Sequence, residues 1–208
     1  MPKDLLFYTN PMSRGRIVRW MLEEVGQPYQ TEIIDYASIK GDAYRAVNPM
    51  GKVPAIHHGD VVVTECAAIC AYLADAFPEA GLAPAPADRG AYYRWLFFAA
   101  GPVEAATTNA RLQVEAPAEL QRMLGYGSLQ DTLDVLEQAV SASEFVAGDR
   151  FSAADVYVGS QIIFGTQFGS IPPRPAFLRY MEQLTQRPAA KRAKEIDDAL
   201  IPALPAQA

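Results

Sequence analysis

The sequence contains only two cysteines and two histidines in 208 residues, which limits the chemistry it can carry. Cys66 and Cys70 have a C-x-x-x-C spacing, which is neither the redox C-x-x-C motif nor a four-ligand zinc pattern. His57 and His58 are adjacent, and no nucleophile–base pattern lies near them. We therefore expect no disulfide framework and no metal, and we expect both histidines to be exposed turn residues.

Long apolar runs and an excess of positive charge are also missing. The opening MPKDLLFYTN turns polar too soon for a signal peptide, and no apolar stretch approaches the ~20 residues of a membrane span. With 18 Lys and Arg against 24 Asp and Glu, the formal net charge is −6, whereas nucleic-acid binding needs a basic surface. These features favour a cytoplasmic globular protein with neither a membrane nor a nucleic-acid partner.

Residues 1–78 begin with short apolar runs on either side of a helical pattern. LLFYT (5–9) and YQTEIIDY (29–36) are typical of strands. Between them, apolar residues recur at helical spacing from Gly15, and Gly26 ends that helix. The pattern predicts a β-α-β unit whose two strands are parallel.

The rest of this region predicts a hairpin and a second long helix. A polar stretch with one helical turn, 42–47, leads to the runs PAIHH and VVVTE, which flank the turn pair Gly59-Asp60. The helix that follows has an apolar face made of Cys66, Ile69, Cys70, Leu73 and Phe77. The order β-α-β-α-β-β-α predicts an α/β, thioredoxin-like N-terminal domain over 1–78.

Beyond this domain the composition changes to a linker and then to helices alone. Residues 79–88 are rich in proline, glycine and alanine, which is typical of a linker, and 89–208 predict an all-α C-terminal domain. A long helix from Tyr92 carries Pro102, which should kink or break it. Apolar residues spaced over 120–136 predict another long helix, loosened at Gly125-Tyr126-Gly127; they are Leu120, Met123, Leu124, Leu129, Leu133 and Leu136.

The segment FSAADVYVGS carries the sharpest local signal of the second half. Ser152 precedes a helical pattern, and Asp155 stands at the third helical position, as in a variant of the capping box. We expect this pair to serve folding rather than chemistry. Two further helices are predicted over 175–186 and 188–199.

A small α/β domain, a proline-rich linker and an all-helical domain, in this order, resemble the soluble glutathione S-transferases. The motifs that carry the resemblance are NPMGKVPAI (48–56), TEC (64–66), the capping segment 151–156 and SRGRIVRWMLEEVG (13–26). They span nearly the whole chain but do not indicate a class. The resemblance implies a glutathione transferase, which binds reduced glutathione, stabilises its thiolate and adds it to an electrophilic apolar substrate.

The same resemblance implies that Pro54 follows a cis peptide bond. X–Pro bonds reach cis in about 5–6% of cases in folded proteins, whereas other bonds almost never do. A cis Val53–Pro54 bond would direct the N–H and C=O of Val53 outward, where the glutathione backbone could pair with them as an added strand. The alternative is a proline that simply begins a strand.

Glu65 and Cys66 lie where the helix after the hairpin begins. The carboxylate of Glu65 can take the γ-glutamyl ammonium, and N–H groups at the helix start can take the adjacent carboxylate. Alternatively, Glu65 is only a favourable acid in a first turn. Cys66 departs from the family pattern, which most often has serine here. Its thiol is a weaker donor than a hydroxyl, and it could pack passively or exchange disulfides with glutathione.

Two lysines could hold the glycyl carboxylate. The resemblance places Lys40 where several classes have a basic residue, and Lys52 is adjacent to Val53. Either lysine could instead be a solvated surface residue. We expect Asn48 to hold the loop rather than to touch ligand.

The thiol-activating group is expected between the first strand and the first helix. Ser13 is the best-placed hydroxyl, although it could simply cap the helix. Asn10 matches the position at which other classes carry tyrosine, and its amide is an alternative donor. Tyr8 and Thr9 also stay open. Arg14 and Arg16 could add positive potential over the thiolate or make structural ion pairs.

The resemblance further implies a homodimer and a pocket for the electrophile between the domains. Its walls would include an aromatic stripe formed by Tyr92, Tyr93, Trp95, Phe97 and Phe98. Two other functions stay open at this point. One is glutathione-dependent peroxide or disulfide reduction, and the other is a non-catalytic glutathione-binding or interaction protein.

Overall fold

The structure is a computed structural model, and it describes residues 4–114 and 116–201. The chain divides into two compact units, each described here by itself. In terms of the described residues, the first comprises 4–81 together with 186–201, and the second comprises 82–185.

The first unit is built on a four-stranded sheet of order β2-β1-β3-β4. The strands are β1 (Leu5–Thr9), β2 (Gln30–Ile33), β3 (Ala55–His58) and β4 (Val61–Thr64). β1 pairs parallel with β2 and antiparallel with β3, and β3 pairs antiparallel with β4. The predicted parallel pair and the predicted hairpin are therefore confirmed.

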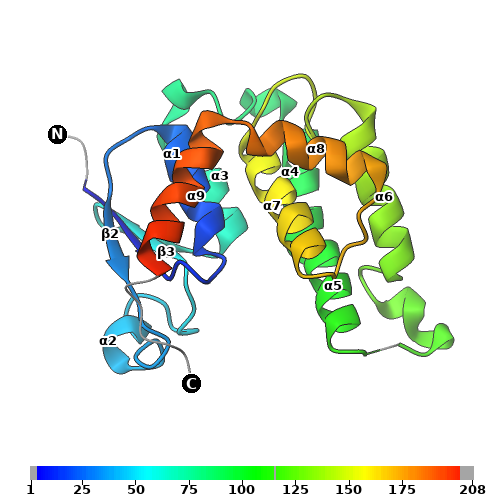
Figure 1. The fold of residues 1–208 in the computed structure, drawn as a ribbon, viewed down its shortest axis with the longest axis horizontal. Coiled ribbons are helices and arrows are strands. Elements are labelled where there is room, and N and C mark those ends of the chain that lie inside the picture. The colour runs from blue at the N-terminus through cyan, green and yellow to red at the C-terminus, as the bar shows by residue number, and fades with distance from the viewer. Residues whose placement is uncertain (1–3, 115, 202–208) are drawn as a thin grey trace. The chain divides into compact units, whose positions relative to one another are not determined.

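The helices of this unit are α1 (Gly15–Val25), α2 (Asp42–Arg45), α3 (Cys66–Ala76) and α9 (Pro188–Leu200). α1 ends where predicted, because Gly26 has a φ of 72°, a left-handed conformation that glycine adopts at little cost. α1 packs against both α3 and α9, and Figure 1 shows α9 lying alongside α1.

The position of α9 differs from the predicted division of the chain. Residues 89–208 were expected to form one helical domain, but α9 belongs to the first unit. Its attachment is polar: Arg19 of α1 forms a buried ion pair with Asp197 of α9, with Nε and Oδ1 3.1 Å apart. The partners are 178 positions apart, and no local pattern announces such a pairing.

The second unit consists of helices. Its elements are α4 (Gly90–Phe98), α5 (Glu104–Arg111), α6 (Leu129–Ala142), α7 (Ala153–Gln167) and α8 (Pro175–Thr185), with short 3₁₀ turns at Pro86–Asp88 and Ala118–Met123. A further 3₁₀ turn, Pro78–Ala80, lies at the end of the first unit. The predicted disturbance at Pro102 is confirmed, because a π-helical segment, Ala99–Val103, separates α4 from α5. The α/β domain followed by helices has the predicted order.

The predicted long helix over 120–136 is not one helix, and the interruption falls at Gly125-Tyr126-Gly127, where a loosening was expected. The chain forms a 3₁₀ segment over Ala118–Met123, and α6 begins only at Leu129. The reason is a cap at Ser128, whose Oγ accepts a hydrogen bond from the backbone N–H of Asp131 at 3.0 Å. This cap fixes the start of α6 at Leu129, nine residues after Leu120, the first leucine of the pattern.

The predicted capping box at the start of α7 is confirmed. Asp155 is fully buried and accepts hydrogen bonds from the backbone N–H groups of Val146 and Ser152 and from the hydroxyl of Tyr180 on α8. Burial raises the pKa of the Asp155 carboxyl, and the bond from Tyr180 opposes that effect. One carboxylate thus joins α7, α8 and the turn before α7.

The two histidines are not exposed turn residues, contrary to expectation. Both lie in β3 and are half-buried. His57 packs edge-on against Tyr8, and His58 shares a 3.0 Å hydrogen bond with the hydroxyl of Tyr72. The turn is formed instead by the following residues 59–60.

No helix among the described residues is both long enough and apolar enough to cross a membrane.

Candidate functional site

The loop before β3 is held by side chains from within the first unit. Asn48 accepts a hydrogen bond from the backbone N–H of Met50 at 3.0 Å and donates to the carbonyl of Lys52 at 2.7 Å. The hydroxyl of Tyr44 donates to the same carbonyl at 2.8 Å. Asn48 is 2% exposed, so it holds the loop from inside, as expected. Two donors on one carbonyl orient the peptide immediately before Val53.

Gly51 in this loop has no room for a side chain. Its φ is 55°, and a Cβ at this position would lie 2.7 Å from the carbonyl oxygen of Ile39. The loop can therefore pack closely on the segment that carries Lys40 only because position 51 is glycine.

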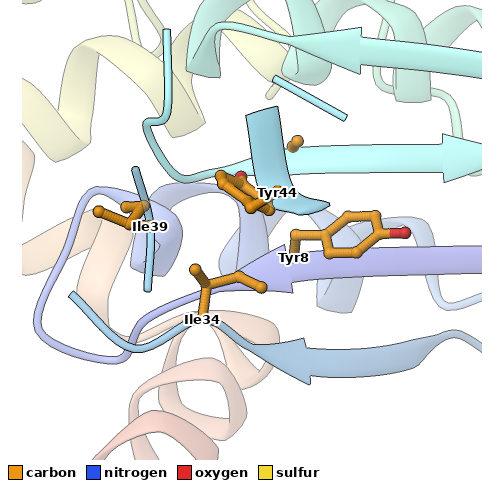
Figure 2. Packing of buried hydrophobic residues seen from close by; sticks show 5 residues of the cluster. Tyr8, Ile34, Ile39 and Tyr44 are labelled. Carbon is orange, nitrogen blue, oxygen red and sulfur yellow. The ribbon is translucent and has the colours of Figure 1, made fainter. Parts of the chain in front are cut away.

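An apolar cluster supports the loop from below. Its buried members are Tyr8, Ile34, Ile39, Tyr44 and Ala55, and Val53 packs against them. Figure 2 shows Ile39 and Tyr44 gathered over Tyr8 and Ile34. Burial raises the pKa of Tyr44 to about 12, which keeps its hydroxyl protonated and able to donate. No sequence spacing pointed to Tyr44 as the support of the carbonyl at position 52.

The Val53–Pro54 peptide bond is cis. Within the described parts of the chain, neither the N–H nor the C=O of Val53 has a hydrogen-bond partner, and β3 pairing starts only at Ala55. Val53 is half-buried, while the next two residues are buried. The backbone edge ahead of β3 thus offers one donor and one acceptor to an extended ligand.

Glu65 has a backbone conformation that is rare for residues other than glycine. Its φ is 69° and its ψ is 120°, and it stands immediately before the first residue of α3. The side chain is exposed and makes no capping hydrogen bond to α3. Backbone strain of about 1–3 kcal/mol at such a residue is retained where the surroundings impose it, and it is frequent at binding sites.

Cys66 begins α3 and lies beside the start of α1. It is 9% exposed, and its Sγ is 3.7 Å from the carbonyl oxygen of Arg14. Both cysteines carry thiols rather than a disulfide. Complete burial raises the pKa of the Cys70 thiol well above its ordinary value, so Cys70 is an inert packing residue.

The loop between β1 and α1 brings Asn10 and Ser13 together. Ser13 donates its hydroxyl proton to the carbonyl of Asn10 at 2.6 Å and accepts from the N–H of Gly15 at 2.9 Å. The amide of Asn10 donates to the carbonyl of Ile34 and accepts from the N–H of Met12. Both side chains therefore shape this loop, and Ser13 also satisfies one N–H at the start of α1.

The two lysines are placed differently relative to the loop before β3. The Nζ of Lys40 donates to the carbonyl of Met50 at 2.7 Å, so its charge lies against this loop. Lys52 is exposed, and its contribution to the loop is its carbonyl, which receives the two hydrogen bonds described above.

Thr9 is fully buried, and its Oγ1 has no partner within the described residues. Replacing Thr9 by valine should raise the free energy of unfolding by about 1 kcal/mol, because an unsatisfied hydroxyl is removed at nearly constant volume. Turnover should not change, since the enclosed hydroxyl cannot reach a ligand. Denaturant unfolding and a conjugation assay would check this.

Thr132 provides the matched control. It is equally buried, but its Oγ1 donates to the carbonyls of Tyr126 and Ser128. Thr132→Val should therefore lower stability. A loss of turnover in Thr9→Val would instead assign Thr9 to the reaction.

Known proteins resemble this chain over the same region and beyond it. A family model described as glutathione S-transferase, N-terminal domain, matches residues 12–76. Glutathione S-transferase F10 of Arabidopsis thaliana is 32% identical over 149 residues, which cover 65% of this chain and 68% of that protein. A glutathione transferase structure from Methylococcus capsulatus has a TM-score of 0.77 at 28% identity, covering 94% of this chain and 99% of the other. A sphingomonad glutathione S-transferase, solved in complex with glutathione, has a TM-score of 0.75 at 28% identity, covering 93% and 98%.

Proposed function

Because this chain belongs to the glutathione S-transferase family, we propose that it binds reduced glutathione, stabilises the thiolate and adds it to an electrophilic apolar substrate. The observation that carries the proposal is the unpartnered backbone edge at Val53, held in place from below by Asn48 and Tyr44. Glutathione is a peptide, and a fixed donor and acceptor suit its cysteinyl backbone.

The ends of glutathione would be held by charged groups on either side of that edge. Glu65 would accept the γ-glutamyl ammonium, and the N–H groups at the start of α3, next to Cys66, would take the γ-glutamyl carboxylate. Lys40, whose Nζ lies against the loop carbonyl of Met50, would attract the glycyl carboxylate together with Lys52. In these assignments, each charged end of the extended glutathione peptide faces a protein group of opposite charge.

The thiol would lie over the loop between β1 and α1. A thiol has an ordinary pKa of about 8.5, and lowering it by about two units requires about 2.7 kcal/mol of preferential stabilisation of the anion. A hydroxyl donor and the unsatisfied N–H groups of a helix start can supply this amount together. To donate, Ser13 must turn its proton from the carbonyl of Asn10 to the sulfur.

The function is tested by titrating the protein with glutathione while thiolate absorbance is followed against pH. We expect saturation, an acid-shifted thiol and conjugation of an aryl halide. No binding at millimolar glutathione would contradict the proposal. Binding without a shifted thiol and without conjugation would favour a non-catalytic binding protein instead.

Ser13→Ala should raise the pKa of the bound thiol by about one unit and lower kcat about threefold at pH 7, because one donor to the thiolate is lost and a smaller fraction of the thiol is ionised. Glutathione affinity should change little. Asn10→Ala should also lower the thermal midpoint, since the Asn10 side chain holds the loop to Ile34 and Met12. Ser38→Ala, an exposed serine of the same unit, is the control. If neither loop variant lowers turnover, both assignments are wrong.

We further propose a cytoplasmic homodimer, which sedimentation and cell fractionation would test. Of the five aromatic residues of α4, Tyr92 and Trp95 are buried, Phe98 is half-buried, and Tyr93 and Phe97 are exposed. The exposed pair is available to an apolar electrophile.

A further inference from the structure

Arg16 joins the loop before α1 to the last helix of the described chain. Its Nε donates to the carbonyl of Pro11 at 2.6 Å, and its Nη2 donates to Oδ1 of Asp198 on α9 at 2.6 Å. Pro11 lies between Asn10 and Ser13, the two candidates for the thiol-activating residue. Arg16 therefore makes a structural ion pair, one of the two roles that the sequence left open.

The geometry of the guanidinium makes this connection directional. Its N–H groups form a rigid planar fork, so fixing one of them on Asp198 fixes the direction in which Nε points. Lysine, with a single ammonium on a flexible stem, cannot hold both partners in this way. The side chains of Arg16 and Asp198 are 22% and 41% exposed, so the pair is partly screened by water and serves orientation more than stability.

The charge on Asp198 is maintained by its neighbours. Hydrogen bonds from Lys194 and Arg16 hold the pKa of the Asp198 carboxyl below its usual range. Asp198 is therefore an anion throughout the neutral range in which a conjugation reaction would be measured.

Other α1–α9 contacts attach the helix without touching the loop. Arg19 pairs with Asp197 inside the unit, and Arg192 donates to the carboxylate of Glu23 at 3.1 Å near the far end of α1. Arg16 hydrogen-bonds both to α9 and to the loop over 10–13, whereas Arg19 and Arg192 make their α1–α9 ion pairs away from that loop. Attachment of α9 and orientation of the loop can therefore be separated by mutation.

We propose that Arg16 and Asp198 are positioning residues, through which α9 fixes the Pro11 carbonyl and hence the orientation of the Asn10–Ser13 loop toward the glutathione thiol. The inference rests on the function proposed above. The proposed binding contacts at Val53 and Glu65 lie on other segments, so loosening the loop should weaken thiolate stabilisation and leave glutathione binding intact. Small displacements of a reacting group can cost large factors in rate.

The test compares Asp198→Ala and Asp198→Glu with Arg192→Gln, which breaks an α1–α9 contact of similar type away from the loop. For Asp198→Ala we expect about a fivefold lower kcat, a KM for glutathione within about twofold of the parent, and a bound thiol pKa raised by about half a unit. Asp198→Glu keeps the charge and should recover part of the loss. Arg192→Gln should change neither kcat nor the thiol pKa.

Thermal unfolding of each variant separates loop orientation from stability. A lower thermal midpoint with unchanged kcat and thiol pKa in Asp198→Ala would overturn the positioning role. Equal losses of turnover in Asp198→Ala and Arg192→Gln would also overturn it, because general loosening of α9 would then suffice. Absence of glutathione binding in the parent protein would contradict the proposed function itself, a result distinct from either of these.

Discussion

Replacing Asp155 by alanine should lower the free energy of unfolding by about 3–5 kcal/mol, the largest loss we expect from a single substitution. The carboxylate is 0% exposed and accepts from two backbone N–H groups and from the hydroxyl of Tyr180. Alanine leaves these buried donors without partners, and each carries a desolvation cost. The measurement is denaturant unfolding at neutral pH.

The chain supplies a matched control for this substitution. Ser128 and Asp131 form the same S-x-x-D pattern at the start of α6, but this pair is exposed to solvent. Asp131→Ala should therefore cost no more than about 1 kcal/mol, since water can replace the lost partner. If Asp155→Ala and Asp131→Ala lowered the free energy of unfolding by the same amount, burial would not be the reason that the Asp155 contacts are strong.

The features that the sequence predicted correctly are local in the chain. The capping box joins residues three positions apart, and the hairpin joins two apolar runs across the pair Gly59-Asp60. The loop 48–53 is also held by a local contact, because the Asn48 side chain donates a hydrogen bond to the carbonyl of Lys52, four positions away. Short-range patterns of this kind fix backbone geometry almost independently of the rest of the fold.

The features that the sequence did not reveal join distant residues. Arg16 and Asp198 are 182 positions apart, and nothing in RGRIV or in DDAL indicates that these residues meet. The packing of α9 in the first unit was not predicted for the same reason, because it depends on contacts between residues far apart in the sequence. A single sequence contains the two charges but not the topology that pairs them.

The error over 120–136 has a different cause, because the correcting signal was present. Leucine spacing alone favoured one long helix, yet Gly125 and Gly127 interrupt it, and Ser128 with Asp131 forms a helix-start pattern. The start of a helix is decided by which N–H groups find partners, and Ser128 supplies one.

Replacing Glu65 by glutamine should weaken glutathione binding about 10-fold to 150-fold while leaving the fold intact. In the proposed site, the carboxylate of Glu65 makes a charge-assisted bond to the γ-glutamyl ammonium, worth about 1.5–3 kcal/mol. The neutral amide of glutamine cannot replace this bond. Stability should not change, because the side chain is exposed and makes no cap to α3, and glutamine keeps the same backbone. Calorimetric titration with glutathione measures the effect.

Asp60→Asn is the control, since Asp60 is an exposed acid on the same hairpin at the opposite end of β4. It changes the net charge by the same amount but should leave the dissociation constant within about twofold, because charges far from the ligand are screened by salt. The comparison isolates the position of the carboxylate from the total charge. Equal weakening in both variants would show that Glu65 acts only through net charge. An unchanged affinity in Glu65→Gln would leave its left-handed backbone as a folding feature of the turn into α3 and remove Glu65 from the binding site.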